Sequence, residues 1–321
     1  MISFIVIGKN EDWKLTKCLQ SLFDTIKYNQ MIAYEIIYVD SNSGDNSIER
    51  AKDFGNVKIY KITSRCNAAD CRNVGAKESK GDVLCFVDGD MEIMPAFFKD
   101  IYSHKSGIIH PFISGKIINY YYNREWKLIT KDPLVPDPND SVQNVTGGFF
   151  LIKREYWFSV KGMRNIFMNG QDLDLGLRIK SELGISHFKK KQVAAIHHTI
   201  SYLDNNRMWG DLLKGIPLYY RSLLYRKHIL SPLVYTRILR SEYSLIILIL
   251  LIIAIFIKLN LFLLSIYFII ILIKSIKMWS KNSNSIISLY FYYIIRDLIV
   301  LFGLIFFHPR ERQKVNYSPI S

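Results

Sequence analysis

Two aspartates separated by a single glycine follow a short apolar segment of the chain. The segment is Val83-Leu84-Cys85-Phe86-Val87, and the tripeptide is Asp88-Gly89-Asp90. Two carboxylates at positions i and i+2 beyond a strand can turn toward one hard divalent cation, and such a cation commonly holds a diphosphate in proteins. Because Asp-Gly is also a common turn, the tripeptide indicates a metal site only if the elements around it agree with one.

The chain divides by composition into a mixed N-terminal part and an apolar C-terminal part. It has 321 residues and a formal net charge of +14, and its hydrophobic residues concentrate after about Ser244. Basic residues cluster beside the apolar part, which favours membrane lipids as partners. No RNA-binding or zinc-finger signature is present, so we expect no nucleic-acid partner. The basic residues are Arg221, Arg226, Lys227, Arg237, Arg240, Lys274, Lys277, Lys281, Arg310, Arg312 and Lys314.

The cysteines and the first residues both indicate a cytoplasmic N-terminal part. Cys18, Cys66, Cys71 and Cys85 contain no C-x-x-C pair, so we expect reduced thiols. The apolar run 1–7 lacks a preceding basic segment and is too short for a signal peptide. We expect this run to form a first strand, so that the N-terminal part of the protein stays in the cytoplasm.

The pattern of apolar residues before residue 90 predicts an α/β fold. Strand-length runs rich in Ile and Val alternate with segments of helical spacing, which indicates a doubly wound, largely parallel sheet. Ligands bind such sheets at the carboxyl ends of the strands, where polar loops occur here. No G-x-G-x-x-G follows the first strand, which counts against a dinucleotide dehydrogenase. The expected strands are 2–7, 35–39, 57–60 and 82–87, and the expected helices are 12–26, a short one after Asn46, and 67–78.

Several motifs in a fixed order carry a resemblance to a known family. Residues 4–11, 39–47, 71–76 and 81–90 resemble the corresponding motifs of family 2 glycosyltransferases with the GT-A fold. Residues 146–152 and 170–178 are similar to the acceptor-side strand and the E-D motif of that family. The resemblance covers roughly residues 1–200. It implies a GT-A type doubly wound mixed sheet, a nucleotide-sugar donor and a divalent cation, Mg²⁺ or Mn²⁺.

The resemblance also assigns residues to the donor site. It implies that Asp90 is a direct metal ligand and that Asp88 faces the ribose or a metal-bound water. Asp40 would accept a hydrogen bond from the base or ribose, although the family often has a second Asp where Ser41 stands. The alternative for Asp40 is a turn-forming residue. The expected donor-binding residues are Ile7, Asn10, Asp40, Ser43, Arg72, Asp88 and Gly89.

Arg72 and the adjacent histidines are further candidates for contacts with the donor. Arg72 would bind a phosphate or stack on the base near a helix N-terminus, and the alternative is a solvated surface charge. His197 and His198 follow an expected strand at 192–196, so their side chains should point to opposite faces. We expect at most one, His197, to reach the metal or the diphosphate, while structural roles remain the alternative.

On the acceptor side, Asp172 is the candidate general base. Attack by a sugar hydroxyl requires removal of its proton, and a positioned carboxylate is the usual group for this step. The alternative is that Asp172 and Asp174 only interact favourably with a helix N-terminus. Gly147, Gly148 and Gln171 complete the expected acceptor side, and Gln171 stands where the family pattern has Glu.

The remaining chain predicts attachment to a membrane. We divide the protein into a catalytic domain at 1–205, amphipathic interfacial helices at 206–243, membrane-embedded helices at 244–307 and a basic tail at 308–321. The apolar stretches within 244–273 are each too short for a full crossing, so they form either a hairpin or one long tilted helix, and the lysines that follow favour the hairpin. The helix at 286–307 carries Arg296-Asp297 at its middle, so we expect it not to cross.

Together these features predict an inverting, metal-dependent glycosyltransferase at the cytoplasmic face of the cell membrane. It would move one sugar from a nucleotide diphosphate, a UDP-sugar by resemblance, to a hydroxyl of a lipid-linked or cell-surface glycan in polysaccharide biosynthesis. One alternative is transfer to a polyprenyl phosphate, whose anionic oxygen needs no base. Another is a catalytically degenerate membrane scaffold, which the retained Asp88, Asp90 and Asp172 disfavour.

Overall fold

The computed structural model describes residues 1–321 except 104–106, 202–203, 257–261, 280–284, 313–314 and 321. The described residues form two compact units. The α/β unit consists of Met1–Asn165, Gln171–Ile200 and Glu311–Ser321, and the helical unit consists of Ile166–Gly170 and Ser201–Arg310. Each unit is described below by itself.

One mixed sheet forms the centre of the α/β unit. Its strand order in the described residues is β10-β12-β8-β11-β4-β1-β2-β3-β13, with β5 beside β12 and β9 beside β8. Strands β1, β2, β3 and β4 are parallel neighbours, whereas β11 runs antiparallel to both β4 and β8. The strands are β1 Ile2–Gly8, β2 Tyr34–Asp40, β3 Val57–Ile62, β4 Val83–Asp88, β5 Met91–Ile93, β8 Phe112–Tyr122, β9 Leu128–Lys131, β10 Ser141–Gln143, β11 Phe149–Lys153, β12 His187–Ile200 and β13 Tyr317–Ile320, while β6 Tyr102–Ser103 and β7 Gly107–Ile108 form a separate pair.

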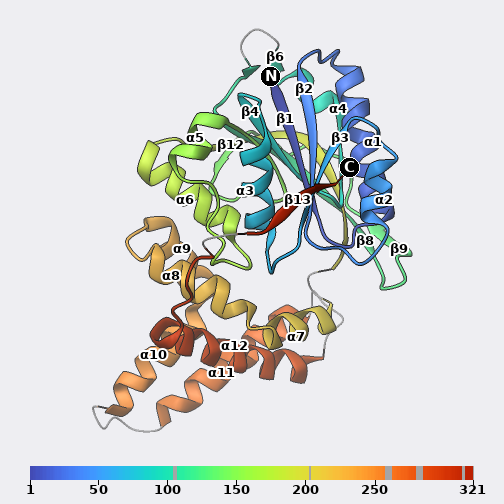
Figure 1. Ribbon diagram of the computed structural model, residues 1–321. Coiled ribbons are helices and arrows are strands. Elements are labelled where there is room, and N and C mark those ends of the chain that lie inside the picture. The colour runs from blue at the N-terminus through green and yellow to red at the C-terminus, as the bar shows by residue number, and fades with distance from the viewer. Residues whose placement is uncertain (104–106, 202–203, 257–261, 280–284, 313–314, 321) are drawn as a thin grey trace. The chain divides into compact units, whose positions relative to one another are not determined.

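Helices cover both faces of this sheet (Figure 1). Phe4 and Val6 lie in the core on the side of α1 and α4, whereas Ile5 and Ile7 lie in the core on the side of α3, α5 and α6. Strands that are buried on both faces need continuous apolar runs, which explains the Ile- and Val-rich pattern of the sequence. The helices are α1 Trp13–Tyr28, α2 Ser47–Lys52, α3 Ala68–Glu78, α4 Pro95–Lys99, α5 Arg154–Ser159 and α6 Gln171–Leu183. The predicted α/β class and the mixed doubly wound sheet are confirmed.

The register of the parallel strands brings three loops together. Gly8 at the end of β1 pairs with Asp40 at the end of β2. Ile7, one residue earlier on β1, pairs with Asp88 at the end of β4. The loops that follow β1, β2 and β4 therefore start at the same edge of the sheet, as expected for carboxyl ends of parallel strands.

Strand β12 is longer than the sequence predicted, so the expected strand at 192–196 needs correction. It runs from His187 to Ile200, and His197 and His198 lie within it rather than after it. Its first half contains Lys189-Lys190-Lys191, three consecutive charged residues without the alternation of apolar and polar residues that predicts a strand. The register of β12 against β8 also shifts between Lys189 and Ala195. Pairing with β8 and β5 holds the segment extended despite this local pattern.

The end of the chain also differs from the expected basic tail at 308–321. Residues Tyr317–Ile320 form β13, which pairs antiparallel with the edge strand β3. Before this strand, the Arg312 guanidinium donates to Asp70 at 2.7 and 3.1 Å. The last residues therefore belong to the α/β unit, because backbone pairing and a partly buried ion pair hold them there.

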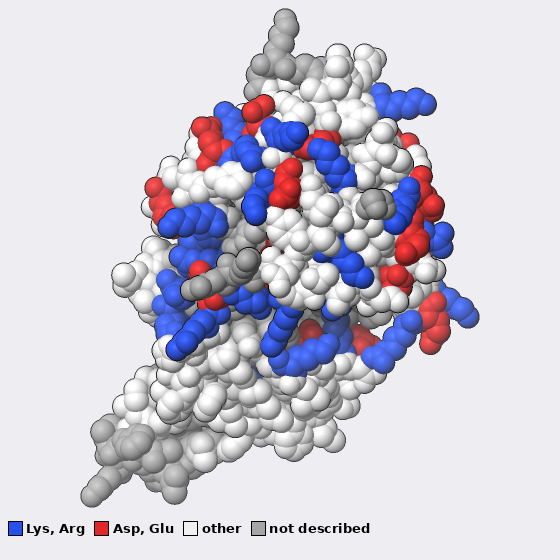
Figure 2. Space-filling model, viewed as in Figure 1, with Lys and Arg blue, Asp and Glu red and all other residues white. Residues whose placement is uncertain are grey.

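The helical unit is strongly apolar. Its elements are α7 Asn205–Leu213, a π-helical segment Leu218–Ser222, α8 Leu223–Lys227, α9 Pro232–Ser241, α10 Tyr243–Phe256, α11 Phe262–Trp279 and α12 Ile286–Phe306. On the face shown in Figure 2, the surface of α10 and α11 is almost without charged side chains. By length and composition, α12 is the one helix in the described ranges that is long and apolar enough to cross a membrane, with a mean hydropathy of 1.9.

The charges in the middle of α12 are paired inside this unit. Arg296 lies 3.1 Å from Glu242 and 2.7 Å from Asp297, and all three side chains are buried. Arg221 lies 2.8 Å from the other oxygen of Glu242. The expected helix at 286–307 is present as α12, and its central charges are paired, which lowers the cost that argued against a crossing. The turn of the expected hairpin at 244–273 lies outside the described residues, and α11 continues to Trp279.

Candidate functional site

A pocket of about 310 Å³ opens at the carboxyl ends of β1, β2 and β4. Both aspartates of the Asp88-Gly89-Asp90 tripeptide line it, together with the start of α3. Gly89 donates its N–H to the Ile7 carbonyl at 2.7 Å, which turns the tripeptide back over the end of β1. The pocket is lined by Ile7, Gly8, Lys9, Glu11, Ser41, Cys66, Asn67, Ala68, Cys71, Asp88 and Asp90.

Asp88 is held from two directions. Its Oδ1 accepts a hydrogen bond from the Arg72 guanidinium at 2.5 Å, and its backbone N–H donates to the Gly148 carbonyl at 2.9 Å. Burial raises the pKa of Asp88 to about 6, against the opposing charge of Arg72. Asp88 therefore depends on Arg72 to remain a carboxylate at neutral pH.

Asp90 has one oxygen that is paired and one that is not. Its Oδ2 lies 3.2 Å from His197 Nε2, whereas its Oδ1 is buried without a hydrogen-bond partner in the described part of the protein. Burial acts to raise the pKa of Asp90, but the hydrogen bond and charge of His197 outweigh it and hold the pKa below its usual range. An ionised, unpaired buried oxygen is a costly feature that a bound cation would satisfy.

These residues fit a divalent cation that also binds substrate oxygens. Among the described residues no group of three or more His, Cys, Asp or Glu side chains is arranged to hold a metal. Two carboxylates next to a pocket suit Mg²⁺ or Mn²⁺, because Mg²⁺ is commonly held by one or two carboxylates together with phosphate oxygens and water. Two carboxylates do not fill the coordination shell of such a cation, so a cation held here would need further oxygen ligands.

A pair of glycines connects Asp88 with Asp172. Gly147 donates its N–H to Asp172 Oδ2 at 3.1 Å, and the carbonyl of the next residue, Gly148, accepts from the Asp88 N–H. Gly147 has a φ of 69°, a left-handed conformation that favours glycine. A side chain on Gly148 would place its Cβ 2.2 Å from Asp88 Oδ2. Only glycine fits this position without a shift of the carboxylate.

Asp172 and Asp174 have different environments although both lie in the first turn of α6. Asp172 is partly exposed and accepts from Gly147. Asp174 is fully buried and lies 2.9 Å from Arg178 and 3.2 Å from Arg164. Asp174 is therefore held by its ion pairs, whereas the Asp172 side chain stays partly exposed. The expected acceptor-side residue Gln171 is buried at the start of the same helix.

Three of the expected donor-binding residues bind other parts of the protein instead of lining the pocket. The Asp40 carboxylate is fully buried and accepts from the Tyr38 hydroxyl at 2.9 Å and from the Ser43 N–H at 2.8 Å. The Ser43 hydroxyl accepts from the Asn10 N–H, and the Asn10 side chain accepts from the Gly44 N–H. This arrangement is the turn that was the alternative for Asp40. Contacts of these residues with a donor stay predictions.

Arg72 is buried rather than solvated, so the surface-charge alternative does not describe it. Apart from its bond to Asp88, it has a buried Nε with no hydrogen-bond partner in the described residues. The first free N–H groups of α3 are used by a capping box between Asn67 and Asp70. The donor anion expected at this helix would therefore contact Arg72 rather than the helix N-terminus.

The two adjacent histidines point to opposite sides of β12, as expected. His197 contacts Asp90 and Asn119, whereas His198 lies 2.6 Å from Glu92 and 2.8 Å from the Tyr122 hydroxyl. His198 also packs its ring against Trp13. Of the two imidazole rings, that of His197 contacts the tripeptide, whereas His198 reaches it only through its backbone N–H, which donates to the Asp90 carbonyl at 2.9 Å.

The sequence did not indicate several residues that line the pocket. Cys66 follows β3 in a loop without a recognisable motif, and its Sγ lies 3.0 Å from Ser41 Oγ. Glu11 lines the pocket and forms an ion pair with Lys14. Lys9 and Glu11 lie in the loop after the first strand, which the sequence did indicate. Neither residue was among the predicted donor-binding residues. Only the folding of α3 against β2 brings Cys66 to this edge.

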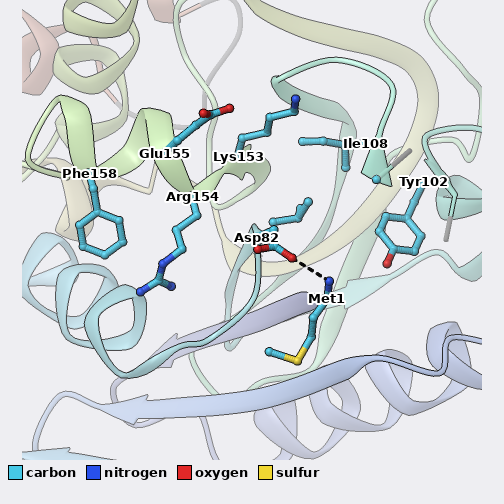
Figure 3. A pocket seen from close by; sticks show the side chains of 10 residues that line it. Met1, Asp82, Tyr102, Ile108, Lys153, Arg154, Glu155 and Phe158 are labelled. Carbon is cyan, nitrogen blue, oxygen red and sulfur yellow. Dashed lines mark hydrogen bonds and ion pairs between the residues drawn. The ribbon is translucent and has the colours of Figure 1, made fainter. Parts of the chain in front are cut away.

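A larger cavity of about 660 Å³ lies at the opposite edge of the sheet, beside the amino ends of β1 and β4 (Figure 3). The Met1 amino group there is 3.0 Å from Asp82, whose side chain is exposed. Lys153 and Arg154 border the cavity from the β11–α5 junction. Its two carboxylates, Asp82 and Glu155, come from different elements, and Asp82 is already paired with the Met1 amino group. Ligands of doubly wound sheets bind at the other edge. We therefore assign the functional site to the smaller pocket.

The N-terminal region of the chain matches a known family. Residues 3–157 match the sequence profile described as glycosyl transferase family 2. This segment contains β1 to β4, the pocket and the Gly147-Gly148 pair. Within this segment the chain is of the family 2 glycosyltransferase type.

Two relatives have similar sequences. An uncharacterized glycosyltransferase of Haemophilus influenzae is 25% identical over 203 residues, which are 59% of this chain and 65% of the relative. A dolichol-phosphate mannosyltransferase of Pyrococcus furiosus is 27% identical over 169 residues, which are 48% of this chain and 46% of the relative. The chain thus spans less than two thirds of the length of either relative.

A solved structure shows the same fold. The structure of GalNAc-T7 with UDP, GalNAc and Mn²⁺ matches with a TM-score of 0.50 at 15% identity, covering 74% of this chain and 54% of that chain. At this identity the likeness shows the GT-A fold alone.

Proposed function

We propose that this protein is a metal-dependent, inverting glycosyltransferase. It transfers one sugar from a nucleotide diphosphate, with UDP as the expected nucleotide, to a hydroxyl of a lipid-linked or cell-surface glycan. The observation that carries the proposal is the hydrogen-bonded connection from Asp88 through Gly148 and Gly147 to Asp172. It connects a candidate donor-side carboxylate and a candidate base to the same pair of glycines.

On the donor side, Asp88 and Asp90 would hold Mg²⁺ or Mn²⁺. A cation there supplies positive charge that offsets the charge developing on the leaving diphosphate. Arg72 keeps Asp88 ionised and has a spare buried N–H for a phosphate oxygen. His197 orients Asp90 through one of its oxygens, so that the other stays available.

On the acceptor side, Asp172 would take the proton from the attacking hydroxyl. Its Oδ2 is fixed by the Gly147 N–H, and its partial exposure leaves room for an acceptor. A single displacement with one base and one metal inverts the configuration at the anomeric carbon. The buried and ion-paired Asp174 is not available as a second base.

The helical unit supports an acceptor at a membrane. Exposed apolar side chains cover α10 and α11, including Leu250, Ile253, Ile269 and Ile273. Both the segment that ends at Ile200 and the segment that begins at Glu311 belong to the α/β unit. The chain therefore leaves the α/β unit and returns to it, so any membrane crossings between these residues would be even in number. The apolar surface supports a membrane-attached enzyme, and the cytoplasmic orientation of the catalytic unit is proposed from the sequence alone.

Transfer to a polyprenyl phosphate is the second candidate. The similarity to a protein named dolichol-phosphate mannosyltransferase favours it. A phosphate acceptor arrives as an anion and needs no general base, so it would leave Asp172 without a chemical role. The two candidates therefore predict different effects of a substitution at Asp172.

A donor screen with the full-length protein in detergent tests the proposal. We would measure nucleotide release from UDP-, GDP-, CDP-, ADP- and TDP-sugars with Mn²⁺, with Mg²⁺ and with a chelator. Asp90→Ala should abolish release from every donor. Asp172→Ala should retain donor binding and lose transfer to a hydroxyl acceptor.

Asp24→Ala is the matched control, because Asp24 is an exposed aspartate on α1 away from the pocket. Full activity of Asp90→Ala would overturn the metal site. Full transfer to polyprenyl phosphate by Asp172→Ala would favour the second candidate. Release by no donor under any metal condition would leave only the scaffold alternative.

A further inference from the structure

Two cysteines occupy the wall of the donor pocket. Cys66 is half-buried in the loop before α3, and Cys71 is buried in the first turns of α3. Both line the same pocket as Asp88 and Asp90. The other two cysteines, Cys18 and Cys85, are fully buried and do not line it. The chain therefore provides one accessible thiol and one adjacent thiol at its candidate donor site.

The contacts of Cys66 are those of a reactive thiol. Its Sγ lies 3.0 Å from Ser41 Oγ, and Cys66 directly precedes the N-cap residue Asn67 of α3, the helix that carries Cys71. The hydrogen bond with Cys71 lowers the pKa of Cys66 to about 6, helped by Ser41 and by the charge of Lys9, although partial burial opposes the shift. By contrast, burial raises the pKa of Cys18 and Cys85 above the usual range. Thiolates, not thiols, react with oxidants and electrophiles.

We propose that Cys66 and Cys71 form an oxidisable pair in the donor pocket, and that their disulfide prevents donor binding. The proposal rests on the proposed donor site. Closing the bond moves Cys66 from Ser41 toward α3 and links the loop after β3 to that helix. Because both residues line the pocket, a changed loop alters its wall next to Asp88 and Asp90. A disulfide of this kind in a reducing compartment is a reversible, sensing bond rather than a structural one.

The chemistry is balanced by a peroxide as oxidant. The Cys66 thiolate attacks one peroxide oxygen, the O–O bond breaks, and hydroxide leaves and takes up a proton to become water. The product is a sulfenic acid on Cys66. The Cys71 thiol then loses its proton and attacks the Cys66 sulfur, the S–O bond breaks, and a second water leaves. Two thiols lose two electrons in total, and one peroxide molecule gains them.

Peptide mapping by mass spectrometry tests the pair without any nucleotide. The folded full-length protein in detergent is treated with hydrogen peroxide and compared before and after reduction with dithiothreitol. We expect a Cys66–Cys71 crosslink that reduction reverses, with Cys18 and Cys85 unmodified as internal controls. In Cys71→Ser, a sulfenic acid on Cys66 should persist and react with dimedone. Absence of both the crosslink and this adduct would overturn the proposal.

Nucleotide binding tests the consequence. With Mn²⁺ and a panel of nucleoside diphosphates, oxidation should weaken binding of the preferred nucleotide by about tenfold or more, and reduction should restore it. Cys66→Ser and Cys71→Ser, each compared with itself before and after peroxide, should show no such reversible loss. A Cys66–Cys71 crosslink that leaves the nucleotide affinity unchanged would refute the proposed effect of the disulfide, but not the proposed donor site. Binding of no nucleotide by the reduced protein would refute the proposed donor site, and with it the proposed consequence of oxidation.

Discussion

Gly148 and Asp88 lie so close that the first has no room for a side chain. The Gly148 carbonyl accepts from the Asp88 N–H at 2.9 Å, and a Cβ on Gly148 would lie 2.2 Å from the Asp88 carboxylate. The glycine thus sets the position of a candidate metal ligand from the turn just before the antiparallel strand β11. It also places Gly147 where its N–H reaches Asp172.

Gly148→Ala should weaken metal-dependent nucleotide binding by about tenfold or more, because the new methyl group displaces the Asp88 carboxylate. Isothermal titration with the nucleotide and Mn²⁺ measures the effect. Gly55→Ala is the control, since nothing lies within 4 Å of a Cβ at that position. Equal affinity of Gly148→Ala and wild type would show that Asp88 tolerates the shift or does not bind metal.

Asp172→Asn and Asp174→Asn form a pair of matched substitutions with opposite effects. Asp172→Asn should stop transfer to a hydroxyl while thermal stability and donor binding stay unchanged. Asp174→Asn should destabilise the protein by about 3–5 kcal/mol, because it leaves Arg178 and Arg164 without their buried partner. Chemical denaturation and a transfer assay distinguish them. A strong loss of stability in Asp172→Asn would argue for a structural role.

Stability should depend on pH through His187. This side chain is buried against Ser114, and burial lowers its pKa to about 3, with His110 and Lys189 acting in the same direction. The unfolded chain binds a proton near pH 6.5 while the folded chain does not. Stability contributed by the neutral histidine is therefore present above about pH 6.5 and is lost as the pH falls toward 3, by up to about 1.4 kcal/mol per unit.

Denaturant unfolding of wild type and His187→Gln between pH 7 and pH 4 checks this prediction. The wild-type free energy of unfolding should fall more steeply with decreasing pH than that of the variant. His228→Gln, which changes a histidine in the helical unit, should keep the wild-type slope. Parallel slopes for wild type and His187→Gln would exclude a neutral buried His187.

Arg312→Ala should lower the free energy of unfolding by about 1–3 kcal/mol, because it leaves the buried Asp70 carboxylate with fewer hydrogen bonds. Asp70 also closes the capping box of α3, so the loss should reduce protection of that helix in hydrogen exchange. Arg310→Ala is the adjacent control. Equal exchange of α3 in both variants would show that the last segment does not stabilise the helix.

The first and last residues should lie on the same side of the membrane, since β13 pairs with β3 in the α/β unit. Tags at the two ends of the chain should be equally inaccessible to protease added outside intact cells and equally accessible after permeabilisation. A crossing by α12 alone would place the ends on opposite sides. Cleavage of only one tag in intact cells would therefore contradict the pairing of β13 in the cell.

The sequence by itself determined the parts whose signals are local. Apolar runs such as 83–87 specify strands, and the tripeptide Asp88-Gly89-Asp90 specifies where carboxylates follow the sheet. The order of motifs specified the family and the mixed α/β fold, and residue type with helix position indicated Asp172. These features depend on residues that are neighbours along the chain.

The tertiary structure decided the properties that depend on distant residues. It buried Asp40 in its own turn, paired Asp174 with two arginines, and brought Cys66 into the pocket wall. It also paired β13 with β3 across more than two hundred residues of chain and compensated Arg296 with Glu242. Whether a carboxylate stays available for a ligand depends on its partners and burial, which no local pattern encodes.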